Sequence, residues 1–232
     1  MPDSPVQLEL RGPVAVLRID DGKANAISHS VLDGLHAALD RATREAAAVV
    51  LAGRPGRFSA GFDLGAFSQG PAATAALVQA GARLALRVYG HPQPVVAACT
   101  GHAIAMGAIL LLACDVRIGA EGSFQIGLNE VAIGMTLPRF GVELARDRLS
   151  RRHLGSAVVL ARMFAPDAAR DAGYLDRTCA ADRVVDEAIE EATRLAELRQ
   201  PALGDTKLRL RAATIASIEA TLAEDIRGLT GT

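Results

Sequence analysis

The 232-residue sequence has no tryptophan, an aromatic content of 3% and only three cysteines. The cysteines, Cys99, Cys114 and Cys179, lie in apolar or helical segments and lack the spacing of metal ligands. We therefore expect buried, reduced thiols, no metal site and an intracellular protein, which we place in the cytoplasm. The first residues are neither basic nor apolar, so no secretory signal is expected.

The sequence also lacks an excess of charge of either sign, because 25 basic and 26 acidic residues give a net charge of −1. This balance gives no reason to expect a nucleic-acid partner. The most apolar run is interrupted by polar residues and glycine before it reaches the length of a bilayer, so no membrane partner is expected. Hydrophobic residues make up 50% of the chain, which excludes general disorder, and the length suffices for one large domain.

Segments with strand character alternate with helical segments over the first three quarters of the chain. Strands are expected at residues 14–19, 49–52 and 95–99, each followed by a loop and a helical pattern. This alternation predicts an α/β core. From Asp182 onward the pattern is helical, with a break at residues 201–204. Such a tail is too short to form a core alone, so it should dock on the body or on a partner chain.

Residues 97–115 are the stretch around which the chain is organised. An apolar strand meets a Thr-Gly turn, small residues follow, and an apolar helix begins near Met106. Small side chains at Ala103, Ala105 and Gly107 leave the backbone open to a flat ligand. The start of a helix presents unpaired N–H groups and a partial positive charge, which suits a developing oxyanion. A buried helix without further role gives the same pattern, so this stretch alone leaves both interpretations open.

Glu130 is the best single candidate for acid–base chemistry. It follows a strand in an otherwise apolar segment, where desolvation would favour its neutral form and suit it to exchange protons. A loop glutamate exposed to solvent, or one that caps a helix, would have the same sequence context. His102, a lone histidine beside a glycine turn, is better explained as hydrogen-bonded structure. Asp63 and Asp115 each end an apolar segment and are expected to cap or brace it.

Several motifs, taken in order, resemble those of the crotonase superfamily, the enoyl-CoA hydratase/isomerase family of acyl-CoA enzymes. Each motif is weak alone, but their order along the chain is specific, and the resemblance covers about residues 14–185. The matching segments are residues 58–64 (Phe-Ser-Ala-Gly-Phe-Asp-Leu), 100–107 (Thr-Gly-His-Ala-Ile-Ala-Met-Gly) closed by Cys114-Asp115, 126–134 (Ile-Gly-Leu-Asn-Glu-Val-Ala-Ile-Gly), Asn25-Ala26 and 166–173.

The resemblance implies a fold, a ligand and an assembly. Residues 1–185 would form the crotonase (ClpP-like) spiral of ββα units that binds an acyl-CoA thioester. Residues 186–232 would form a helical region that supports a homotrimer or a dimer of trimers, or covers the site as a lid. Coenzyme A enters as part of the substrate, so no separate cofactor is expected, and the reaction would belong to fatty-acid metabolism.

The resemblance also assigns site residues by motif position. The backbone N–H groups of Phe62 and Met106 would form the oxyanion hole for the thioester carbonyl. Lys23 and Arg57 are candidates for the CoA phosphates, although solvated loop cations would fit the sequence equally well. The expected substrate- and CoA-binding set is Lys23, Ala24, Asn25, Arg57, Ala60, Asp63, Leu64, Gly107 and Ile109.

Departures from the hydratase pattern favour a double-bond isomerase. Hydratases of this family use two glutamates to place and activate water; Ile109 stands at the first position and Glu130 at the second. An aliphatic residue with a lone glutamate in a Gly-Leu-Asn-Glu context is typical of the Δ3-Δ2-enoyl-CoA isomerases. Met106 stands where hydratases usually have glycine, so its side chain is expected to crowd the acyl pocket. A 2-enoyl-CoA hydratase and a non-catalytic acyl-CoA-binding protein remain the alternatives.

Overall fold

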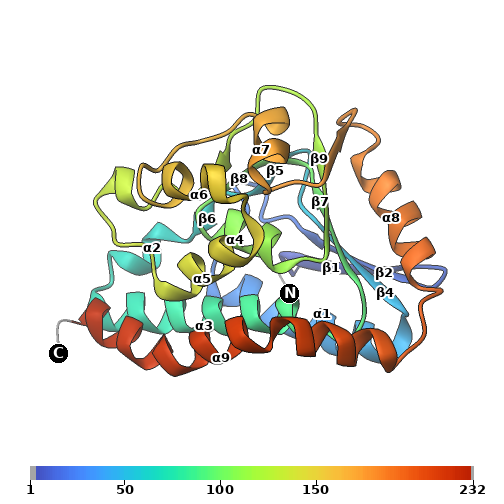
Figure 1. Cartoon of the computed structure of the whole chain (residues 1–232), viewed down its shortest axis with the longest axis horizontal. Coiled ribbons are helices and arrows are strands. Elements are labelled where there is room, and N and C mark those ends of the chain that lie inside the picture. Colours follow the sequence, from blue (N-terminus) through green and yellow to red (C-terminus); the bar gives the residue numbers. More distant parts are fainter. Residues whose placement is uncertain (1–3, 231–232) are drawn as a thin grey trace.

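The computed structural model describes residues 4–230 and has a six-stranded sheet at its centre (Figure 1). The first two strands form an antiparallel hairpin, and every later neighbour in the sheet pairs in parallel. In spatial order the strands are β1 (Val6–Arg11), β2 (Val14–Ile19), β4 (Ala48–Ala52), β7 (Val95–Cys99), β9 (Val116–Ala120) and β11 (Arg177–Cys179).

Two small sheets carry the segments that matched the family motifs. One has the parallel order β10 (Ile126–Gly127), β8 (Gly101–Ile104) and β5 (Gly56–Ser59), and the other pairs β3 (Ala26–Ile27) with β6 (Gly61–Phe62). Strands β7 and β9 are each followed by one short strand of a small sheet and then by a helix, whereas β4 is followed by two such strands, β5 and β6, before α2. This repeat confirms the expected spiral of ββα units.

The helices complete the spiral and form the C-terminal region. Serine before a helical segment favours the N-cap position, and Ser28 caps the first of the helices by accepting a hydrogen bond from the Val31 N–H group. The predicted boundary after residue 185 falls inside α8. In chain order the helices are α1 (His29–Glu45), α2 (Leu64–Phe67), α3 (Pro71–Tyr89), α4 (Met106–Ala113), η1 (Val131–Ile133), α5 (Arg139–Arg148), α6 (Arg151–Val158), α7 (Pro166–Ala172), α8 (Val184–Leu195) and α9 (Ala202–Thr230).

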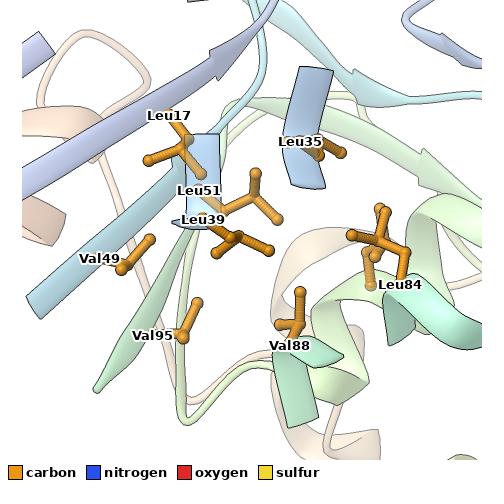
Figure 2. Close-up of a pocket in the computed structure, with 9 residues that line it drawn as sticks. Leu17, Leu35, Leu39, Val49, Leu51, Leu84, Val88 and Val95 are labelled. Atoms are coloured by element: carbon orange, nitrogen blue, oxygen red, sulfur yellow. The ribbon is translucent and has the colours of Figure 1, made fainter. Parts of the chain in front are cut away.

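Both faces of the large sheet are buried. Figure 2 shows the packing of one face, where leucines and valines from strands β2, β4 and β7 meet those of α1 and α3. The residues around this point enclose only about 10 Å³, roughly the smallest space that holds one water molecule, so this is packed core and not a binding site. Helix α8 covers the opposite face with Val184, Ala188 and Ala192.

The last helix, α9, packs along α3 and α5 (Figure 1). A buried cluster of charges joins α9 to the rest of the protein. Lys207 Nζ and Arg211 Nη2 of α9 lie 2.6 and 2.9 Å from the carboxylate oxygens of Asp115. Asp115 also accepts a hydrogen bond from the N–H of Val95 at the start of β7. Asp115 is therefore a brace, as expected, and the tail docks on the body of its own chain. No helix within residues 4–230 is both long enough and apolar enough to span a bilayer.

Replacing Asp115 by asparagine should lower the free energy of unfolding by about 3 kcal/mol, because two buried cations lose their counter-charge. Urea or thermal unfolding measures this loss. Glu9→Gln is the matched control, since Glu9 pairs with Arg11 at the surface, where both side chains are 59% exposed, and solvent screens such pairs so strongly that they contribute little to stability. Equal effects of the two substitutions would contradict the assigned role of Asp115.

Candidate functional site

A pocket of about 300 Å³ lies where the short strands, α4 and the segment after β10 converge. Glu130 is the only ionisable side chain among its lining residues in the described part of the chain. The rest of the wall is almost entirely apolar. The lining residues are Ala24, Ala26, Ala60, Phe62, Leu64, Phe67, Val78, Ala105, Ile109, Asn129, Glu130, Ile133, Met135, Pro138 and Phe140.

Two glycines place Glu130 at this wall. Gly127 in β10 has φ +155°, and a Cβ there would lie 3.0 Å from the carbonyl oxygen of Arg162. Gly134 ends the 3-10 turn after Glu130 in a left-handed conformation, with φ +78°. The chain between them therefore turns sharply after the strand, and this turn carries Asn129 and Glu130 into the pocket wall.

The carboxyl group of Glu130 is buried, with 7% of the residue exposed. Its Oε2 atom has no hydrogen-bond partner among the described residues. Burial raises the pKa of this carboxyl, and a hydrogen bond from its own backbone N–H opposes the rise only in part. A carboxylate destabilised in this way is a stronger base than an exposed one, as proton abstraction from carbon requires. The structure thus confirms that the Glu130 carboxyl is buried beside apolar side chains.

The backbone around Met106 has the form expected of an anion-binding helix start. Met106 is the first residue of α4, so its N–H has no partner within the helix, and the preceding Ala105 has the unusual φ of 52°. Strand β6 lies directly against this point: a Cβ built on Gly61 would lie 2.9 Å from the Ala105 Cβ and 3.6 Å from the Met106 nitrogen.

The N–H of Phe62 is also turned away from the strand that pairs with it. The next N–H, of Asp63, donates to the Ile27 oxygen in β3 at 3.1 Å. Because successive N–H groups of a strand point to opposite sides, the Phe62 N–H points away from β3. The segments that carry the two N–H groups therefore adjoin at Gly61 and Ala105. That the pair forms an oxyanion hole stays a prediction.

The expected crowding of the pocket by Met106 is wrong. Its side chain is fully buried, and its terminal methyl lies 3.5 Å from where a Cβ on Gly81 of α3 would stand. Gly81 also makes room for the ring of Phe62, which a Cβ there would meet at 2.4 Å. The methionine thus fills the core behind the pocket, and the sequence could not reveal this because α3 lies far from Met106 along the chain.

The structure brings together six of the predicted site side chains: Glu130, Phe62, Ala24, Ala60, Leu64 and Ile109 all line the pocket. Lys23, Asn25, Arg57, Asp63 and Gly107 are not among the lining residues.

Asn25 has a structural role instead of a place in the pocket wall. It is fully buried with φ 55°, and its amide donates to the backbone oxygens of Ile19, Arg57 and Phe58 at 2.8–3.3 Å. These bonds hold the loop so that its neighbours, Ala24 and Ala26, face the pocket.

Three further predicted residues act through local structure. Asp63 caps α2 by accepting from the Gly65 N–H, as the sequence suggests. Gly107 allows α4 to pack closely against the end of β5, because a Cβ there would lie 2.5 Å from the Ser59 oxygen. His102 accepts a hydrogen bond from the Gln125 N–H, which confirms its structural interpretation.

Sequence reasoning missed several residues that line the pocket. These are Phe67, Val78, Met135, Pro138 and Phe140, together with the polar Asn129, which directly precedes Glu130. Residues 135–140 directly follow the Glu130 motif, so their place in the sequence could have predicted that they line the same pocket. The other two come from α2 and α3 and carry no motif.

The chain has clear relatives among known proteins. Residues 9–230 match the family model described as enoyl-CoA hydratase/isomerase. Mouse mitochondrial enoyl-CoA delta isomerase 1 is 28% identical over 232 residues, which cover 97% of this chain and 80% of the mouse protein.

Solved structures agree with this match. An enoyl-CoA hydratase/isomerase family protein from Pseudomonas syringae is 40% identical, with a TM-score of 0.95 and coverage of 97% of this chain and 98% of that one. An enoyl-CoA hydratase from Mycobacterium marinum is 37% identical, with a TM-score of 0.91 and coverage of 95% of this chain and 97% of that one. The relatives thus include proteins named for isomerisation and proteins named for hydration.

Proposed function

Because the chain belongs to the enoyl-CoA hydratase/isomerase family and is an enzyme of the crotonase superfamily, we propose that it converts a 3-enoyl-CoA to the 2-enoyl form. The observation that carries this proposal is the single ionisable group, Glu130, in an otherwise apolar pocket wall within the described residues. Double-bond migration needs one group that removes a proton and returns it. Hydration also needs groups that orient and activate water.

The proposed reaction moves one proton and no other atom. The Glu130 carboxylate takes a proton from C2 of the 3-enoyl thioester, and the electron pair shifts into the conjugated system as a dienolate. The N–H groups of Phe62 and Met106 donate to the thioester oxygen on which negative charge accumulates; each such donor typically contributes about 3 kcal/mol to the transition state. Protonated Glu130 then delivers the proton to C4, and the double bond lies between C2 and C3.

The apolar side chains that line the pocket with Glu130 favour this outcome over water addition. Ile109 lies in the first turns of α4, fully within the core cluster, and lines the pocket together with Pro138 and Phe140. None of these side chains can hold a water molecule against a double bond. An apolar site also protects the dienolate from unwanted protonation by solvent.

A panel of 2- and 3-enoyl-CoAs of varied chain length, with product analysis by mass spectrometry, tests this proposal. We expect 3-enoyl-CoAs to be converted to 2-enoyl-CoAs without gain of mass. Faster water addition to 2-enoyl-CoAs would instead establish a hydratase. Calorimetric binding of these thioesters with no change in any of them would establish a binding protein.

We also propose that the chain assembles as a homotrimer or a dimer of trimers. Large apolar side chains are exposed on α9 and on the segment after α6, with Leu210 81% and Leu160 75% exposed, and an apolar surface of this kind favours a partner. Light scattering at micromolar concentration should give three or six chain masses, and a monomer mass would contradict the assembly.

A further inference from the structure

Gly81 lies in the interior of helix α3, where glycine weakens a helix relative to alanine. Its backbone is ordinary α-helix and does not have a positive φ, so no conformational requirement explains the residue. Gly81 is buried, as are Leu77 and Leu84, about one turn before and after it. The reason for a glycine at this place therefore lies in the atoms that face it.

The ring of Phe62, from strand β6, fills the space beside Gly81. A Cβ built on Gly81 would lie 2.4 Å from Cζ and 2.5 Å from Cε1 of this ring. Phe62 also lines the pocket, as does Val78, which precedes Gly81 by almost one turn of α3. The ring of Phe67, another lining residue, has its centroid 6.2 Å from that of Phe62. The Phe62 ring thus contributes both to the surface of α3 and to the wall of the pocket.

A side chain at Gly81 would displace the Phe62 ring and little else. The ring would have to retreat from 2.4 Å to at least 3.4 Å, where ordinary van der Waals contact begins. The Met106 methyl, at 3.5 Å, already lies at such a distance. The backbone of Phe62 is held by its pairing with Ile27 in β3, so the outer atoms of the ring must move. The open space that adjoins this ring is the pocket, and the displaced ring would occupy part of it.

We propose that Gly81 determines the length of the acyl chain that the pocket accepts, because its missing side chain lets the Phe62 ring withdraw from the pocket towards α3. This proposal rests on the proposed function only in taking an acyl-CoA thioester as the ligand, and it holds whichever reaction follows. Each methylene group that an apolar pocket buries strengthens binding about fourfold, until the chain meets the wall. The position of the ring therefore sets the chain length at which affinity stops rising.

Calorimetric titration with saturated acyl-CoAs, from acetyl-CoA to palmitoyl-CoA, tests this proposal, because these thioesters have no double bond to move. The parent protein defines the longest chain for which the Kd still falls. In Gly81→Ala the Kd for that chain should rise by at least about fourfold, the contribution of one methylene group. The Kd for acetyl-CoA, which has no acyl methylene to bury, should be unchanged. An unchanged chain-length profile, or an equal loss of affinity for both thioesters, would overturn the proposal.

Gly155→Ala is the matched control, because it makes the same change in helix α6, where a Cβ would meet open space. Both Kd values should be unchanged in this variant. Phe62→Leu removes Cε1 and Cζ, the two ring atoms that the new Cβ would meet. In the Phe62→Leu background, Gly81→Ala should therefore leave the chain-length profile unchanged. The same effect of Gly81→Ala in both backgrounds would show that the ring does not transmit it, and would overturn the proposal.

If Gly81→Ala folds poorly, Phe62→Leu alone tests the same wall of the pocket. The smaller side chain should let the pocket accept a longer acyl chain than the parent does, and an unchanged limit would overturn the proposal. A profile that follows these expectations, in a protein that isomerises no 3-enoyl-CoA, would support the role of Gly81 and reject the double-bond shift. A parent protein that binds no acyl-CoA of any length would overturn both.

Discussion

Glu130→Gln should lower kcat/KM for the double-bond shift by about 10²–10⁴-fold, the usual contribution of a positioned acid–base group. Glutamine keeps the size of the side chain but cannot accept the proton from C2. Because no other ionisable side chain of the described residues lines the pocket, no neighbour can replace it. Steady-state kinetics with a 3-enoyl-CoA measure the loss, and a change of less than about twofold would exclude Glu130 as the base.

The free energy of unfolding of Glu130→Gln, measured against pH, shows whether its lower activity comes from the missing base or from misfolding. The folded-state pKa of Glu130 is raised, so the native protein binds this proton more tightly than the unfolded chain does. The stabilisation that comes from protonated Glu130 is complete below the pKa of a glutamate in the unfolded chain. It is lost as the pH rises through the raised pKa of Glu130 in the folded protein. The glutamine variant does not ionise, so it should gain stability relative to the parent as the pH increases over this interval. A variant that is inactive and unstable at neutral pH would need a different explanation.

Gly107→Ala should lower kcat/KM by about 10²-fold, the scale of a misplaced oxyanion donor. The added methyl would stand 2.5 Å from the Ser59 oxygen and 2.8 Å from the Ser59 Cβ. Either the start of α4 or the segment leading into β6 must move. Each movement separates the N–H of Met106 from that of Phe62, so transition-state stabilisation should fall even though neither donor is altered.

Gly155→Ala in α6 is the control for this glycine. No atom lies within 4 Å of a Cβ at Gly155, and alanine is a better helix former than glycine by about 1 kcal/mol. Its activity should match the parent and its unfolding temperature should be equal or higher. Full activity of Gly107→Ala, with stability retained, would contradict the assignment of the helix start as the oxyanion site.

Local signals predicted much of this fold. The strand–turn–helix pattern of residues 97–115 became β7, β8 and α4, and the cap at Ser28 forms as expected. Asp115 braces a segment end and His102 is structural, as their contexts indicated. Glu130 lines the pocket, and the signal for it in the sequence is an ionisable side chain within an otherwise apolar segment. In each case the deciding information lies within a few residues of the feature.

The predictions that failed concern contacts between residues that lie far apart in the sequence. The direction of the Met106 side chain depends on a glycine in α3, and two of the unpredicted lining residues of the pocket come from α2 and α3. Asn25 is a predicted ligand-binding residue, but its side-chain amide donates to the backbone oxygens of Ile19 nearby and of Arg57 and Phe58 in the distant strand β5. Such contacts require the folded arrangement of segments that are separate in the sequence.

The central claim is that one buried carboxyl makes both proton transfers in an apolar pocket. A 3-enoyl-CoA carrying deuterium at C2, followed by mass spectrometry and NMR of the product, tests it most directly. We expect a 2-enoyl-CoA that retains part of the label at C4, and conversion by Glu130→Gln that is slower by about 10²–10⁴-fold. A product hydroxylated at C3, or complete loss of the label to solvent during a single turnover, would contradict it.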